Sequence, residues 1–248
     1  MDFKDPTNKE ELKNKINSTI EEYRDLLINL TDDPNTYKKS ALLYYWLRDY
    51  KNYIKNEDTF DPKYYPEFYR GSIVNINFGF NLGSELGGLH YAIVLKDSNK
   101  KNPNITVVPL TSLKRDKDIK ELRPTELYLG QELYFKIQGK YEALKISIPT
   151  EINYLRNMLS HSEKIDLNDI QQKIEELTKQ SNLMIKAFNK LKTLKYGSIA
   201  VMNQIRTVSK MRIIDPTNKY DILYNLKLST NNLNSIDKKM IELFTKHN

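Results

Sequence analysis

The chain has three histidines, and one of them, His90, stands where a side chain can do chemistry. It directly follows Gly87-Gly88-Leu89, where a flexible loop enters a predicted strand, and loops held on a rigid scaffold commonly present reactive side chains. Histidine has an unperturbed pKa of about 6.5, so it can take and give protons near neutral pH. The alternative is a hydrogen-bonded histidine at a strand entry. We predict surface positions without a chemical role for His161 and His247.

The loop before His90, with the sequence NLGSELGG, offers few other reactive groups. Glu85 is a candidate general base, although a single loop glutamate is more often solvated or caps backbone amides. The loop has neither the spacing of a dinucleotide-binding fingerprint nor that of a P-loop, and it leads into a strand instead of a helix. Histidines and carboxylates do not cluster at metal-ligand spacing, and the absence of cysteine excludes thiolate sites and disulfides. We expect neither a metal nor a cofactor.

Composition and charge favour a folded protein with a polyanionic partner. The 248 residues include 39 Lys and Arg against 32 Asp and Glu, a net charge of +7. Residues 1–68 hold 11 basic and 14 acidic groups, net −3, so the remaining 28 basic and 18 acidic groups give residues 69–248 a net charge of +10. The sequence has no apolar run of about 18 residues and no signal-peptide pattern at its start, so we expect a cytoplasmic protein without a membrane partner.

The first 66 residues read as a helical region. Thr7 to Glu10 has the pattern of a capping box, and the apolar spacing that follows predicts a helix over about 8–30 with one apolar face. Asp33-Pro34 predicts the start of a second helix over about 35–55. The segment 57–66, rich in Asp, Pro and Tyr, reads as a linker.

From Arg70 the hydrophobic period changes to two, which predicts an antiparallel sheet or barrel. The predicted strands are GSIVNINFGF, HYAIVLK, ITVVPLT, TELYL around 125–129 and a return to strand character over 196–209. A helical insertion at about 130–194 interrupts this domain, with helices expected at 151–160, capped by Thr150, and from Asp166 to about Lys192; residues 130–150 are ambiguous. A C-terminal helix is expected from Ser235. We therefore expect an α+β protein with a barrel domain over 67–248.

Three blocks of this domain together resemble the MazF/PemK family of toxin ribonucleases from toxin–antitoxin systems. The blocks are RGSIVNINFGFNLGSELGGLHYAIVLKD, ITVVPLTS and YGSIAVMNQIRTVSKMRI, and the similarity covers roughly residues 69–129 and 195–248. The resemblance implies a small SH3-like antiparallel β-barrel with a flanking C-terminal helix, commonly a homodimer. It also implies metal-independent endoribonuclease activity on single-stranded RNA, in which the ribose 2′-hydroxyl attacks its own phosphodiester and leaves 2′,3′-cyclic phosphate and 5′-hydroxyl ends.

The resemblance also assigns site residues. Thr111 keeps a family position, whereas His90-Tyr91 stands where the family usually has Arg-Pro. We predict His90 as general acid or base and Thr111 as a hydrogen-bond donor to the phosphate; arginine, with a pKa above roughly 12, is a poor base. The assigned substrate contacts are Ser84, Glu85, Ser112, Gln204 and Arg206. A salt bridge, for example to Glu85, is the alternative role of Arg206.

Two further alternatives stay open. Loss of the usual arginine leaves a barrel that binds without cutting, either nucleic acid or a protein target such as gyrase, on which toxins of a related fold act. The expected partner of a toxin is a cognate antitoxin with an acidic, partly helical segment. The acidic residues 1–68 either cover the basic remainder of the chain or simply extend its core or dimer interface.

Overall fold

The computed structural model describes residues 2, 4–114, 118–161, 167–195 and 197–245. The chain divides into two compact units. One comprises the residues up to Thr59 together with Gly79–Leu82, and the other comprises Phe60–Phe78 and the residues from Gly83 onward. The expected domain boundary at residue 66 stays a prediction.

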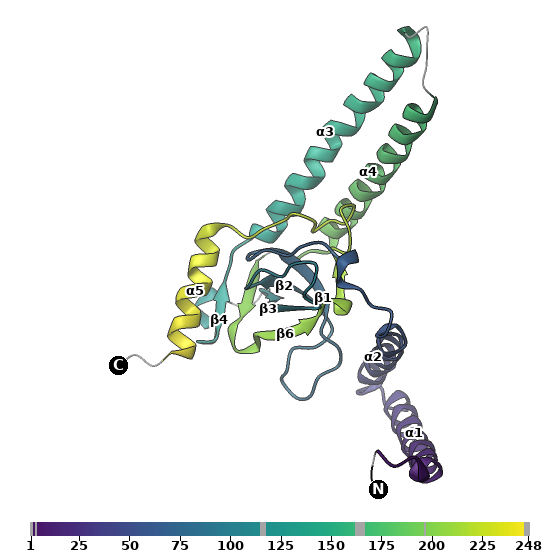
Figure 1. Ribbon diagram of the computed structural model, residues 1–248. Coiled ribbons are helices and arrows are strands. Elements are labelled where there is room, and N and C mark those ends of the chain that lie inside the picture. The colour runs from purple at the N-terminus through teal and green to yellow at the C-terminus, as the bar shows by residue number, and fades with distance from the viewer. Residues whose placement is uncertain (1, 3, 115–117, 162–166, 196, 246–248) are drawn as a thin grey trace. The chain divides into compact units, whose positions relative to one another are not determined.

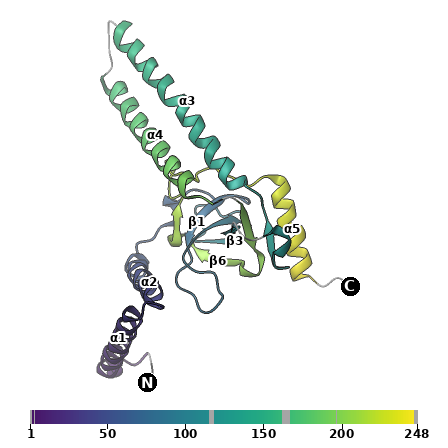
Figure 2. The ribbon, with the colours of Figure 1, turned by 180° about the vertical axis from the view of Figure 1, so that it is seen from behind.

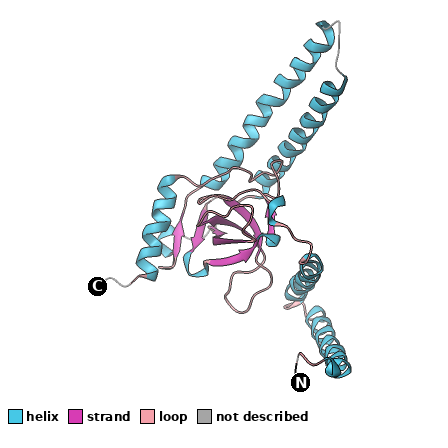
Figure 3. Ribbon diagram, in the orientation of Figure 1, coloured by secondary structure: helices cyan, strands magenta, loops and turns pink. Residues whose placement is uncertain are grey.

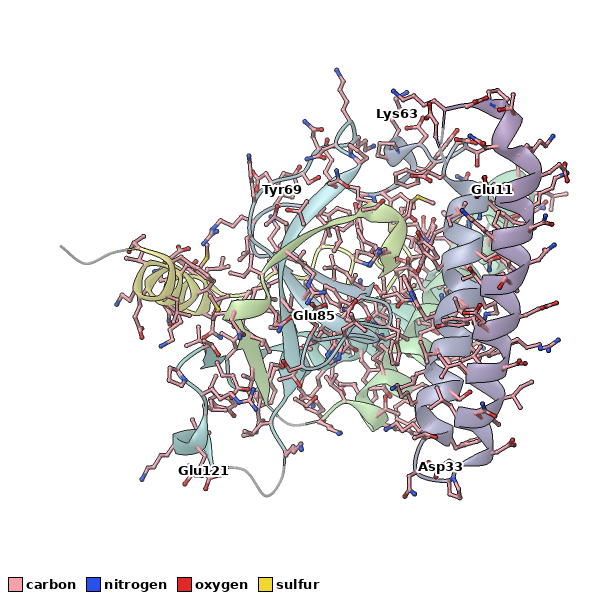
Figure 4. All side chains as sticks on the ribbon, turned by 90° about the horizontal axis from the view of Figure 1, so that it is seen from below. Glu11, Asp33, Lys63, Tyr69, Glu85 and Glu121 are labelled. Atoms are coloured by element: carbon pink, nitrogen blue, oxygen red, sulfur yellow. The ribbon has the colours of Figure 1, made fainter. Side chains whose placement is uncertain are left out.

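The first unit is a pair of antiparallel helices, α1 (Lys9–Asp32) and α2 (Tyr37–Asn56), as predicted. In Figure 4, Glu11 and Asp33 mark opposite ends of this pair. The predicted capping box does not form, because the Thr7 hydroxyl bonds to Asp5 and α1 has no side-chain cap. The Asp33 carboxylate accepts the amide of Asn35 in a turn, so α2 begins later than predicted.

The second unit is built on an antiparallel sheet, drawn in magenta in Figure 3. Its strands run in the order β4-β5-β3-β2-β1-β7, with β6 also paired to β3. Their bounds are β1 Ile73–Asn77, β2 Leu89–Val94, β3 Asn104–Ser112, β4 Glu126–Tyr128, β5 Ser198–Val201, β6 Arg206–Ser209 and β7 Ile213–Asp215. The mixed α+β class is as predicted. No pairing within the described residues joins β4 to β7, so by its strand pairing the sheet is open, where a closed barrel was expected.

The long strand β3 organises this sheet. One edge of β3 pairs with β2, and the other edge pairs first with β6 over residues 104–107 and then with β5 over residues 110–112. Alternate residues therefore supply two cores, one on each face of the sheet. Val107 and Ala92 belong to one core, while Val108 and Ile93 belong to the other, which includes residues of the helices.

The insertion is one long helical hairpin, α3 (Glu132–His161) and α4 (Leu167–Thr193), which lie side by side in Figures 1 and 2. The ambiguous residues 130–150 thus belong largely to α3, and the expected short helix at 151–160 is the second half of that helix. Thr150 is not a cap. Its hydroxyl donates to the Ile146 carbonyl within the helix, and α3 continues through Pro149.

The C-terminal part differs from the predicted pattern in three places. The expected strand over 196–209 is two strands, β5 and β6, because a turn at Met202–Gln204 separates their partners along β3. The strand β7 was not predicted. The last helix, α5 (Thr230–Phe244), begins earlier than expected: Ser229 caps it, and the Ser235 hydroxyl bonds to Asn231 inside the helix. Among the described residues, no helix is long and apolar enough to cross a membrane.

Candidate active site

His90 and Thr111 come from neighbouring strands and line one cavity of about 350 Å³. Ala92 of β2 lies opposite Pro109 of β3, and continuing this register by two residues sets His90 beside Thr111 on the same face of the sheet. The predicted substrate contact Ser112 lines the same cavity. The structure therefore brings together three of the seven site residues expected from the sequence.

The backbone around His90 fixes its imidazole. Gly88, just before β2, has a φ of +81°, a conformation that glycine adopts without steric cost, so the loop turns sharply into the strand. His90 is half-buried, and its Nδ1 lies 2.8 Å from the Leu110 carbonyl oxygen. A carbonyl oxygen only accepts hydrogen bonds, so this bond requires Nδ1 to carry the hydrogen. The neutral ring then has its lone pair on Nε2, which is available for proton transfer.

The Thr111 hydroxyl is available to a ligand. Thr111 pairs with Ile199 of β5 through the backbone, and its half-buried side chain makes no hydrogen bond to another described residue. A hydroxyl of this kind can donate to a phosphate oxygen. His90 and Thr111 thus provide a proton-transfer group and a hydrogen-bond donor in the same cavity.

The wall of the cavity includes residues that the sequence analysis did not assign to the site. Leu133 from the first turn of α3 and the segment from Thr193 to Lys195 after α4 contribute to it, and so does Lys114 after β3. Lys114 and Lys195 are exposed, and none of the described residues that line the cavity is a carboxylate. The sequence signal for Lys195 was a basic residue directly before a predicted strand, which is too common a pattern to single it out.

Gln204 and Arg206 form a separate cluster. The Gln204 side-chain oxygen accepts a hydrogen bond of 2.6 Å from the Arg206 guanidinium and one of 3.3 Å from the Leu86 amide. The guanidinium lies over the Phe78 ring, 5.2 Å from its centroid. Neither residue lines the cavity of His90. Arg206 and Glu85 are both described, and the guanidinium of Arg206 bonds to Gln204 and makes no ion pair with Glu85.

The register of β3 explains this separation. Arg206 lies opposite Val107, four residues from Thr111, which corresponds to about 13 Å along a strand. Ser84 and Glu85 are exposed on the loop before β2 and are likewise outside the cavity lining. Figure 4 shows Glu85 on this loop, in front of the strands in that view. These four residues do not surround His90 and Thr111, although an extended polynucleotide is long enough to reach beyond one cavity.

Tyr91 is a lining residue whose phenol stays neutral. Burial, together with the negative charge of Asp215, raises its pKa well above the ordinary value of 10.0. The Lys190 ammonium lies over the Tyr91 ring, 5.1 Å from its centroid. Tyr91 therefore acts as a packing group and not as a base. No group of three or more His, Asp or Glu side chains within the described part of the chain is placed to hold a metal ion.

A known protein family matches the part of the chain that contains His90 and Thr111. The family of PemK-like, MazF-like toxins of type II toxin–antitoxin systems matches residues 69–178. This match confirms the resemblance to the MazF/PemK family; it includes His90 and Thr111, continues into the helical hairpin and ends before the block that contains Gln204 and Arg206. No curated protein matches the chain.

Proposed function

We propose that this chain, whose residues 69–178 match the family of PemK-like, MazF-like toxins of type II toxin–antitoxin systems, is a toxin that cuts single-stranded RNA without a metal ion. The reaction is a transesterification. The ribose 2′-oxygen forms a bond to phosphorus, the bond between phosphorus and the 5′-oxygen breaks, and the products are a 2′,3′-cyclic phosphate and a 5′-hydroxyl end.

His90 serves as the general base in this proposal. Its Nε2 takes the proton of the attacking 2′-hydroxyl, while the Leu110 carbonyl, bonded to Nδ1, orients the ring and stabilises the imidazolium that forms. The leaving 5′-oxygen takes a proton from water. A positioned base of this kind contributes roughly 10²- to 10⁴-fold to the rate.

Thr111 donates its hydroxyl hydrogen to a non-bridging phosphate oxygen. Charge builds up on these oxygens as the 2′-oxygen attacks, so a donor placed there stabilises the transition state more than the ground state. Ser112 and Lys114, which line the same cavity, add a second hydroxyl and a positive charge.

The observation that carries the proposal is the common cavity of the His90 imidazole and the Thr111 hydroxyl, with the imidazole held through Nδ1. The test is incubation of the purified protein with a long RNA in EDTA, followed by mapping of the RNA ends. We expect discrete cuts with cyclic-phosphate ends that His90→Ala and Thr111→Ala both abolish. RNA that stays intact with the wild-type protein would exclude the nuclease.

One observation favours a second candidate, a barrel-like module that binds RNA without cutting it. The described residues that line the cavity include no arginine, since Arg206 is held by Gln204 and Phe78 elsewhere on the sheet. Retarded but uncut RNA in the same experiment would support this module. In either case the family implies an antitoxin partner, and we propose an acidic, partly helical antitoxin segment that covers the basic site; a homodimer remains a prediction.

A further inference from the structure

The helical insertion builds part of the site. Four of the residues that line the cavity of His90 come from the hairpin or from its exit: Leu133, Thr193, Leu194 and Lys195. We propose that Lys195 is an RNA-binding residue, which holds the phosphate next to the scissile one and so makes the insertion part of the substrate groove. This inference rests on the proposed function, because it names the group that positions the same substrate.

Leu194, directly before Lys195, and Gly197, two residues after it, are each held by backbone hydrogen bonds. Before Lys195, the Leu194 amide donates to the Lys190 carbonyl at 2.9 Å, which continues the last turn of α4, and the Leu194 side chain packs on the core. After it, Gly197 adopts a φ of +82°, and its carbonyl accepts the amide of Leu113. A Cβ at Gly197 would lie 3.0 Å from the Tyr128 ring, so this close approach to β4 favours glycine. Lys195 thus directly follows the anchored last turn of α4.

The lysines that line the cavity differ from those of the adjoining surface in whether a carboxylate lies beside them. Lys186 and Lys190 each lie 4.0 Å from a carboxylate, of Asp221 and Asp215 respectively. Lys114 and Lys195, by contrast, have no carboxylate partner in the described part of the chain. Two ammonium groups without a carboxylate partner among the described residues, beside a hydrogen-bond donor and an imidazole, make a site for a phosphodiester.

The remaining lining fits an unpaired nucleotide. Leu89, Leu133 and Leu194 present apolar surface in the same cavity, and the Leu89 side chain is 62% exposed. Apolar surface next to a phosphate-binding group suits a base or ribose that is not in a duplex, since proteins bind splayed-out bases of single strands by such contacts. The ligand class is therefore single-stranded RNA.

Equilibrium binding measured against salt concentration tests Lys195. The probe is a fluorescent single-stranded RNA, and the background variant is His90→Ala, so that the RNA stays uncut. Each lost phosphate contact lowers the slope of log Kd against log salt by about 0.7 for a single strand. We expect this loss for Lys195→Gln, with recovery in Lys195→Arg, and no change for Lys192→Gln. Lys192 is the control because its ammonium lies over the Phe188 ring, outside the cavity lining.

Cleavage kinetics, measured on proteins that retain His90, give a second readout. Lys195→Gln should raise KM about 5- to 20-fold with a much smaller change in kcat, because the contact holds the substrate in the ground state as well. An unchanged salt slope, or an equal loss in Lys192→Gln, would overturn the role of Lys195. Cleavage that persists in His90→Ala would instead overturn the role of His90 as the base, and the salt slopes would then be measured with a 2′-O-methyl RNA, which lacks the attacking hydroxyl and stays uncut.

Discussion

The Nδ1 atom of His90 lies 2.8 Å from the carbonyl oxygen of Leu110, the residue directly before Thr111. Two consecutive residues of β3 therefore serve the site. The Leu110 carbonyl orients the imidazole, and the Thr111 side chain carries the hydroxyl that we propose as a hydrogen-bond donor to the phosphate. The distance between the two groups depends on the pairing of β2 with β3 and not on a mobile loop. The predictions below start from this arrangement.

Replacement of His90 by alanine should abolish the base without changing the fold, because the side chain is only half-buried at the end of a strand. We expect the rate of RNA cleavage to fall about 10²- to 10⁴-fold. Added imidazole should restore part of the rate in His90→Ala and have no effect on the wild type. A rate that stays within threefold of the wild type would remove His90 from the mechanism.

The hydroxyl of Thr111 can be tested with two substitutions of nearly equal shape. Thr111→Val removes the hydroxyl while keeping the β-branched strand residue, and we expect kcat to fall about 10²-fold through loss of a donor to the transition state. Thr111→Ser keeps the donor and should retain most of the activity. Equal activities of the Val and Ser variants, with melting temperatures unchanged, would contradict the assigned role.

The Gln204 side chain should hold the loop before β2 in place, because its oxygen accepts the Leu86 amide as well as the Arg206 guanidinium. Loss of one such hydrogen bond, about 1 kcal/mol, corresponds to roughly a fivefold larger open population. We expect Gln204→Ala to increase proteolysis within 83–88 by this factor. Asn203→Ala, at the exposed neighbouring position, is the control, and equal rates in both variants would refute the prediction.

Glu132 connects the start of the insertion to the start of α5, and this connection should make stability depend on pH. Its side chain is 16% exposed and accepts hydrogen bonds from the Ser229 amide and hydroxyl and from Asn232, with Lys136 3.3 Å away. Burial by itself raises the pKa of Glu132, but these hydrogen bonds outweigh it and lower the pKa below its ordinary value of 4.5. The ionised form is therefore the one that stabilises the folded state.

The sign of the effect follows from linkage. A carboxyl group with a lowered pKa in the folded state contributes its full stability above the ordinary value of 4.5 and loses it as the pH falls through the lowered value. We expect Glu132→Gln to reduce the free energy of unfolding by about 1–2 kcal/mol at pH 7, and the difference from wild type to shrink progressively as the pH falls below 4.5. Urea titrations at several pH values measure it, and Glu142→Gln, an exposed site on the same helix, should show little effect at any pH.

The sequence determined the local elements and indicated the two residues that we propose for the reaction. Apolar spacing is a local property, so it predicted α1, α2 and α4 and the strands β1 to β3. His90 stood out because a glycine-rich loop meets a strand there, and Thr111 because it lies in a block resembling a family of toxins. The family match over residues 69–178 confirms that resemblance.

Tertiary structure alone decided which of the candidates share a cavity. The register of β3 keeps Arg206 about 13 Å along the strand from Thr111, and the hairpin of α3 and α4 returns the chain so that Lys195 joins His90. The division of 196–209 into β5 and β6 also depends on long-range pairing with β3. Such contacts join residues more than 80 positions apart, and local periodicity in one sequence carries no information about them.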